Sequence, residues 1–214
     1  MKFTQLLFIV ILASNAYATT RMLCTAALIE SGKAMRQQQY IACLQNLSSY
    51  GLYLYVVESV FPHGPTFLDD YAQDVFYANT NNPRLRNKGV NEAMAMQAAL
   101  HHYAFDDNDM IIKYTARYIL HSDNFLKAVE NHPEVDAVVC RDSHGQVRTV
   151  CFAMRNHHMK QMLSELNFNR MEHASINFEW EVAQYITRHK VKTLELTTIG
   201  LSGHVGGSNE FYAA

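Results

Sequence analysis

Residues 87–120 constrain the fold of this chain more than any other stretch. The pattern predicts a helix with a polar, basic start, then an acidic loop, then a strand over residues 110–120. Because side chains alternate between the two faces of a strand, Lys113, Thr115 and Arg117 share one face. Buried cations destabilise a protein unless a carboxylate or a bound anion compensates them. The segment therefore predicts either an anion site or a structural ion pair.

The rest of the chain alternates between strand and helix patterns. Apolar strands at residues 22–29 and 52–57 flank a helix at residues 33–47, and this opening implies parallel strands. The later predicted elements are a strand at 75–78, helices at 87–102 and 124–131, an antiparallel hairpin of 136–140 and 147–154, helices at 159–166 and 176–189, a strand at 191–199, and a loop from residue 200. The fold class is α/β: a Rossmann-like, mostly parallel mixed sheet flanked by helices, with a late β-hairpin.

Size and charge narrow the class of protein. With 214 residues, the chain has the size of one domain. Its hydrophobic content of 49% and charged content of 18% are typical of a globular protein. The net charge of −2 argues against a general nucleic-acid binder, which would be basic.

The amino terminus carries a targeting pattern. A basic residue, Lys2, precedes a short apolar run at residues 6–13, and Ala-Tyr-Ala at residues 16–18 is an A-x-A cleavage site. The apolar run is too short for a membrane span, which needs about 20 residues. The pattern predicts a signal peptide at residues 1–18 and a single domain at residues 19–214, exported or in the secretory pathway.

Two alternatives to export remain open: a buried first strand, or translation that begins at Met22. Export would permit disulfides. Cys140 and Cys151 are the better pair, because symmetric pairing about the turn at Gly145 places them opposite each other, and a register slip would separate them. The alternative is that they are small buried apolar residues.

The acidic turn at residues 106–109 is a candidate metal site, because clustered carboxylates are suitable ligands for Mg²⁺ or Mn²⁺. It precedes the strand at 110–120, however, and ligands of open α/β sheets bind at the carboxyl ends of strands. That edge would be about 20 Å away at about 3.3 Å per residue. A solvated turn is the favoured interpretation.

Several polar residues do follow strands or open helices. Glu58 follows the second strand, where a carboxylate suits a ribose or a base. Lys88 lies at the start of a helix, whose free N–H groups and dipole attract anions. Arg117 lies toward the carboxyl end of its strand and suits bidentate phosphate binding. Glu179 is a candidate general base. The alternatives are a helix cap for Glu58, an ordinary helix start at Lys88, an exposed helix acid for Glu179, and an ion pair of Lys113 or Arg117 with Glu58 or Glu179.

The order of motifs resembles a known family. The segments TAALIE, VVES, NTNN, NKGVNEA, IIKYTARY and INFE follow one another as in small GT-A-type glycosyltransferases and related nucleotide-diphospho-sugar transferase-like proteins. The resemblance spans residues 22–207. It implies a GT-A fold and a nucleotide-sugar donor. The nucleotide would contact Thr25, Ala26 and Glu58, and the diphosphate would lie near Lys88, Lys113 and Arg117.

The resemblance implies transfer of a sugar to a carbohydrate or another hydroxyl acceptor. A divalent metal, Mn²⁺ or Mg²⁺, would accompany the donor in many such enzymes, but no D-x-D motif follows a strand here. In several of these proteins a K-x-T-G-R-Y strand follows an N-K-G-x-x-E helix, and here Ala116 stands where that strand has Gly. No metal ligand is therefore assigned, and cations would replace the metal. The alternative is an exported, non-catalytic α/β protein that binds a carbohydrate or another protein.

Overall fold

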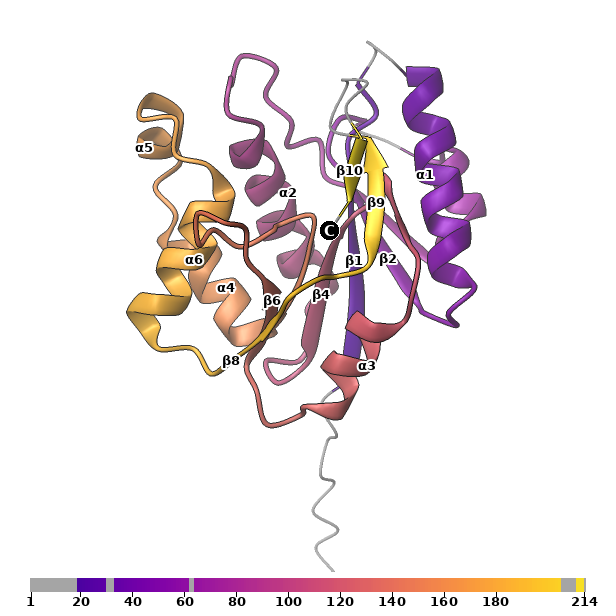
Figure 1. Ribbon diagram of the computed structural model, residues 1–214. Helices are drawn as coiled ribbons and strands as arrows, with labels where there is room; N and C mark the ends of the chain where they lie inside the picture. The colour runs from indigo at the N-terminus through magenta and orange to yellow at the C-terminus, as the bar shows by residue number, and fades with distance from the viewer. Residues whose placement is uncertain (1–18, 30–32, 62–63, 205–210, 214) are drawn as a thin grey trace, which may run out of the picture.

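The computed structural model describes residues 19–29, 33–61, 64–204 and 211–213 (Figure 1), and the predicted signal peptide at 1–18 lies outside these residues. The strands are β1 Thr20–Ala26, β2 Leu54–Glu58, β3 Asp74–Tyr77, β4 Met110–Thr115, β5 Tyr118–Leu120, β6 Ala137–Cys140, β7 Cys151–Arg155, β8 Thr193–Leu196, β9 Leu201–His204 and β10 Phe211–Ala213. The helices are α1 Lys33–Ser48, α2 Lys88–Tyr103, α3 Asn124–Asn131, α4 Asn156–Glu165, α5 Phe168–His173 and α6 Phe178–His189, with a 3₁₀ turn at Phe67–Asp70.

The main sheet has seven strands in the order β3-β2-β1-β4-β7-β6-β8. β1 pairs in parallel with both β2 and β4, and β2 pairs in parallel with β3. β7 alone among these strands runs the other way, antiparallel to β4 and β6. The predicted mostly parallel, mixed sheet with a late hairpin is confirmed. The carboxyl ends of β1, β2, β3 and β4 consequently meet at one edge.

Helices cover both faces of this sheet (Figure 1). On one face α1 and α3 contribute buried Tyr40, Leu44 and Phe125 to an apolar core. On the other face α2 and α4 contribute Met96 and Met159 to a second core, together with α6. Among the described helices, none combines the length and the apolar character that crossing a bilayer requires.

The strand predicted over residues 110–120 is in fact two strands in two sheets, so this prediction was wrong. β4 ends in the main sheet, and β5 pairs with β9 in a separate three-stranded sheet, β10-β9-β5. Between them, Arg117 N–H donates to Thr115 O at 2.7 Å and closes a tight turn. The break occurs where the neighbours of β4 stop: β1 has ended, and the pairing with β7 stops at Tyr114 and Cys151.

The predicted loop from residue 200 was also wrong, because β9 and β10 occupy part of it. Its glycines had indicated a break in structure. Gly203 instead permits close packing: a Cβ there would lie 2.7 Å from Tyr118 Cδ1 and 2.9 Å from Arg117 O. The small sheet thus packs directly on the turn that carries Arg117.

The cysteines are not cross-linked. All four are free and buried. β6 and β7 are antiparallel, with Ala137 opposite Met154. Toward the turn the register slips, since Arg148 N–H donates to Cys140 O at 2.8 Å. Cys140 therefore lies opposite Arg148 and not Cys151, so the proposed pairing does not occur and the alternative of small buried residues fits.

Candidate functional site

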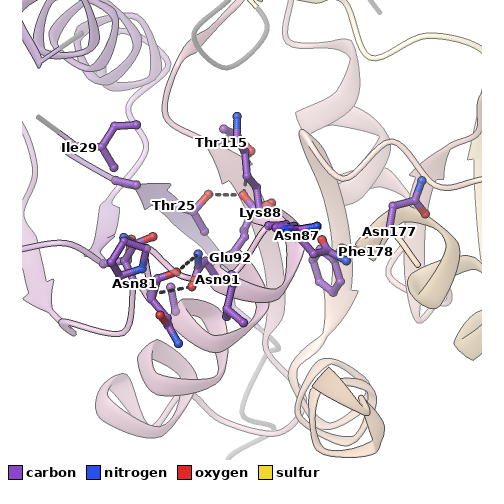
Figure 2. Close-up of a pocket in the computed structure, with 18 of the residues that line it drawn as sticks. Thr25, Ile29, Asn81, Asn87, Lys88, Asn91, Glu92, Thr115, Asn177 and Phe178 are labelled. Carbon is purple, nitrogen blue, oxygen red and sulfur yellow. Dashed lines mark hydrogen bonds between the residues drawn. The ribbon is translucent and has the colours of Figure 1, made fainter. Parts of the chain in front are cut away.

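A cleft of about 1090 Å³ lies at the carboxyl ends of β1, β2 and β4. Thr25 and Ala26 of β1, Ser59 after β2 and Thr115 of β4 line it, and the first turns of α2 and α6 complete it (Figure 2). Its charged lining residues are Arg36, Arg86, Lys88, Glu92, Arg117, Glu172 and Glu179. The position agrees with the general rule that open α/β sheets bind ligands at this edge.

The start of α2 is capped by its own side chains. Asn87 Oδ1 accepts a hydrogen bond from Gly89 N–H at 3.0 Å, and Asn87 O accepts one from Val90 N–H at 3.2 Å. These amides are therefore occupied, so an anion at this edge depends on side chains more than on the helix N–H groups. Lys88 is exposed and lines the cleft. Gly89 permits close contact with α6, because a Cβ there would lie 2.9 Å from Phe178 Cβ.

Lys113 forms a structural ion pair, the second of the two interpretations open from sequence. Its Nζ lies 2.7 Å from Glu92 Oε1 and donates to Thr115 Oγ1 at 2.7 Å and to the carbonyl oxygen of Thr149. The partner is Glu92 and not Glu58 or Glu179. Three acceptors match the three N–H groups of an ammonium, and the side chain is 0% exposed and does not line the cleft.

Glu92, on α2, is a site residue that the sequence interpretation did not single out. Its Oε1 also accepts hydrogen bonds from Thr25 Oγ1 at 2.7 Å and Thr115 Oγ1 at 3.2 Å. Burial raises the pKa of this carboxyl, but the charge and hydrogen bond of Lys113, together with the hydrogen bond from Thr25 and the charge of Arg117, outweigh burial, and the net pKa is lowered. Its Oε2 receives no hydrogen bond from the described residues, and the side chain is 24% exposed. Glu92 is thus an ionised carboxylate with one oxygen open to the cleft.

Arg117 differs from Lys113 in having no hydrogen bond or ion pair through its side chain within the described chain. Its guanidinium lies 5.9 Å from the ring centroid of Tyr118, a cation–π distance.

Arg36 of α1, which the sequence analysis did not single out, lines the same cleft and donates from Nη1 to Ala27 O at 3.0 Å. Arg36 is 8% exposed, so its guanidinium lies within the structure and not on its surface.

Glu58 lies beneath the loops and not in the cleft. Its Oε1 accepts hydrogen bonds from Leu28 N–H at 3.1 Å and Val60 N–H at 2.8 Å. Burial raises its pKa, although these backbone hydrogen bonds oppose the shift. Glu58 therefore joins the loops after β1 and β2, and it is absent from the cleft lining.

Glu179 lies in the first turn of α6 and lines the cleft. Its Oε1 accepts a hydrogen bond from Thr149 Oγ1 at 2.6 Å, so the carboxylate has a fixed orientation. Thr149 also accepts from Lys113 through its carbonyl oxygen. Two of the cleft carboxylates, Glu92 and Glu179, are thereby linked through Lys113 and Thr149.

The acidic turn lies at the amino end of β4, as the sequence predicted. Asp107 is exposed and pairs with Lys160 at 2.9 Å, whereas Asp109 is buried and pairs with Arg21 at 3.1 Å. Within the described ranges, no group of three or more His, Cys, Asp or Glu residues could hold a metal ion. The turn is therefore partly solvated and partly structural.

Known proteins resemble this chain in structure and not in sequence. No family model and no curated protein matches it. Among solved structures, it resembles 4-diphosphocytidyl-2C-methyl-D-erythritol synthase with 14% identity, a TM-score of 0.49 and coverage of 84% of this chain and 88% of the other. It resembles the glycosyltransferase GlyE of Streptococcus pneumoniae TIGR4 with 12% identity, a TM-score of 0.48 and coverage of 83% and 45%.

A third similar structure is the galactosyltransferase LgtC, with 8% identity, a TM-score of 0.42 and coverage of 82% of this chain and 72% of that one. The fold class rests on this chain's own topology, with one reversed strand, β7, in an otherwise parallel sheet covered by helices on both faces. This is the Rossmann-like, mostly parallel mixed sheet with a late β-hairpin that the sequence predicted.

Proposed function

We propose that this protein binds a nucleotide sugar in the cleft and transfers the sugar to a hydroxyl acceptor. The observation that carries the proposal is the guanidinium of Arg117, which lines the cleft at the ligand-binding edge of the sheet and forms no ion pair or side-chain hydrogen bond within the described residues. Its charge contributes to the lowered pKa of Glu92 without a direct ion pair. A partly buried cation of this kind gains most from a bound anion. Lys88 and Arg36 line the same cleft and add positive charge.

In this proposal Arg117 and Lys88 neutralise the diphosphate of the donor. As the bond between the sugar carbon and the phosphate oxygen breaks, negative charge grows on the leaving diphosphate, and fixed cations stabilise that change. Lys113 acts indirectly, because it holds Glu92 ionised and in place. The binding test below includes a divalent metal, because oxygen atoms of the donor can themselves serve as metal ligands.

Glu92 and the residues around it would recognise the donor's hydroxyl groups. Its open Oε2 is an acceptor without a protein donor among the described residues, so a ribose or sugar hydroxyl would satisfy it. Thr25 and Ala26 end β1 beside it and would contact the nucleotide. Glu58 would contribute through the shape of the two loops that it joins.

Glu179 is the proposed general base. It would accept the proton of the acceptor hydroxyl while the hydroxyl oxygen bonds to the sugar carbon and the diphosphate leaves. Its hydrogen bond from Thr149 fixes one carboxylate oxygen and leaves the other for the acceptor. The step needs no redox partner, and the proton and the leaving group balance.

The test is calorimetry with UDP, GDP and CDP, with and without Mn²⁺, followed by incubation with the matching sugar nucleotides. The proposal expects binding by at least one nucleoside diphosphate and weaker binding by Arg117→Ala. Arg84→Ala is the matched control, because Arg84 is exposed in the loop that precedes α2 but does not line the cleft. No binding by the folded protein at about millimolar ligand, an affinity of only about 4 kcal/mol, would exclude the proposal.

A second candidate is a non-catalytic carbohydrate- or protein-binding protein. The full pairing of Lys113 with Glu92 favours it, because one expected diphosphate ligand is already satisfied. It predicts no nucleoside diphosphate binding and no turnover of any sugar nucleotide. Binding of UDP, with hydrolysis or transfer that Glu179→Gln abolishes, would decide for the enzyme.

A further inference from the structure

The opposite edge of the sheet holds a second buried charged group, Asp109, with 3% exposure. Its Oδ1 accepts a hydrogen bond from the backbone N–H of Thr19 at 2.9 Å, and its Oδ2 accepts one from Arg21 Nε at 3.1 Å. Thr19 is held from its other side as well, because Met110 N–H donates to Thr19 O at 2.9 Å. The nitrogen of Thr19 therefore sits at fixed distance from a buried carboxylate.

The same nitrogen belongs to the peptide bond that follows the A-x-A pattern at residues 16–18. We propose that this bond, between Ala18 and Thr19, is hydrolysed, and that the new α-ammonium group of Thr19 forms an ion pair with Asp109. One water is consumed, Ala18 leaves as a carboxylate, and Thr19 N becomes an ammonium. An endopeptidase of the exporting cell with small-residue specificity catalyses the step.

Cleavage strengthens the existing contact without moving it. Before cleavage the donor to Asp109 is a neutral amide, and after cleavage it is a cation at the same position. The hydrogen bond from the amide to the carboxylate of Asp109 is already charge-assisted, and cleavage adds the Coulomb attraction of a full positive charge, which the burial of Asp109 shields less from salt than an exposed carboxylate. Arg21 is the other charge that faces Asp109, and it occupies the other oxygen.

The geometry also distinguishes the two starting points that the sequence left open. Translation from Met22 would remove both Thr19 and Arg21, and Asp109 would lose the hydrogen bonds that these two residues donate. A buried carboxylate without donors is strongly destabilising. It would also shorten β1, which begins at Thr20. A start at Thr19 keeps every one of these contacts.

The first test is the mass of the amino-terminal peptide of the full chain after expression in an exporting host. The proposal expects Thr19 as the first residue. A first residue of Met1 or Met22, or cleavage at another bond, would overturn it.

The second test is the reactivity of the Thr19 amine in that mature protein. Acylation with an acetyl ester at pH 7, read by peptide mass spectrometry, should be about tenfold slower than in Asp109→Asn, which corresponds to one pKa unit of the amine. Asp107→Asn is the control: it removes an exposed acid of the same turn and should leave the rate unchanged. Equal rates in the wild type and Asp109→Asn would contradict the ion pair.

A third measurement keeps the test independent of how well Asp109→Asn folds. Acetylation of the Thr19 amine restores the neutral amide that precedes cleavage. The acetylated wild-type protein should show about a tenfold lower folding equilibrium constant in urea than the unmodified mature protein. No difference between the two would overturn the proposal even if the amino terminus is Thr19.

Discussion

The two edges of the sheet each hold a carboxylate in an ion pair, but only at the amino edge does each of the two carboxylate oxygens accept a hydrogen bond. At the amino edge both oxygens of Asp109 accept donors, from Thr19 and Arg21. At the carboxyl edge Glu92 takes all its donors on one oxygen and leaves the other open, and the side chain of Arg117 has no polar partner in the described residues. A pair that satisfies itself stabilises the fold, whereas unsatisfied groups at a cleft are available to a ligand.

The same contrast separates two cations that lie only a few residues apart. The ammonium group of Lys113 contacts three acceptors within the structure, whereas Arg117 lies in the turn after β4. The break between β4 and β5 produces this difference, because it takes Arg117 out of the strand that holds Lys113. The small sheet then packs on the turn through Gly203.

The largest expected effect is on stability, from Lys113→Met. The change leaves Glu92 as a mostly buried carboxylate without its cation, and the free energy of unfolding should fall by about 3 kcal/mol in urea denaturation. The double variant Lys113→Met with Glu92→Gln removes the uncompensated charge and should recover more than half of the loss. A decrease in the free energy of unfolding of less than about 1 kcal/mol would show that Lys113 contributes no more than an exposed lysine in a surface salt bridge, and would contradict its structural role.

Gly203→Ala should cost about 2 kcal/mol, because the new Cβ would overlap Tyr118 and the carbonyl of Arg117. Since the same contact positions Arg117, the variant should also bind UDP more weakly than the wild type. Urea denaturation and calorimetry measure the two effects on one preparation. Wild-type stability together with wild-type affinity would show that the small sheet does not position the turn.

Arg117→Ala should weaken the binding of UDP about tenfold, or about 1.4 kcal/mol, with little change in stability, within about 0.5 kcal/mol. Arg117→Lys keeps the charge but loses the planar guanidinium, so its affinity for UDP should lie between those of the wild type and Arg117→Ala. Calorimetry gives the affinities. If Arg117→Ala lost much stability and kept its affinity for UDP, Arg117 would be a structural residue and not a ligand-binding one.

The smallest effect is a pH dependence from Glu92. Its pKa in the folded protein is lowered, because Lys113 outweighs burial, so ionised Glu92 stabilises the fold above the unfolded pKa of about 4.3. That stabilisation is lost as the pH falls through the lower folded pKa. The difference in free energy of unfolding between wild type and Glu92→Gln should be constant above about pH 5.5 and shrink in acid. A difference that grows in acid would contradict an ionised, paired Glu92.

Sequence patterns predicted the parallel opening, the hairpin and the position of the acidic turn, because each depends on local periodicity and turn residues. The break after Thr115 was not predictable in that way. Residues 110–120 alternate as one strand should, and only the lengths of the neighbouring strands end the pairing. Gly203 was likewise interpreted as a loop residue, because close packing on Tyr118 leaves no local mark.

For the site, sequence singled out Lys88, Arg117 and Glu179, which line the cleft, but did not single out Glu92. The requirement that buried Lys113 needs a carboxylate was correct, yet the partner is on a neighbouring element and could not be chosen from spacing alone. Helical geometry offers a partial signal, since Lys88 and Glu92 lie on one face of α2, four residues apart.

The most direct test of the contrast between the two edges is NMR of the full protein during a titration with UDP. We expect the amide signals of Lys88, Glu92 and Arg117 to shift together and saturate at one affinity, while those of Arg21 and Asp109 at the other edge stay in place. Shifts confined to the amino edge, or none at the carboxyl edge up to about millimolar UDP, would contradict a ligand site at the carboxyl edge.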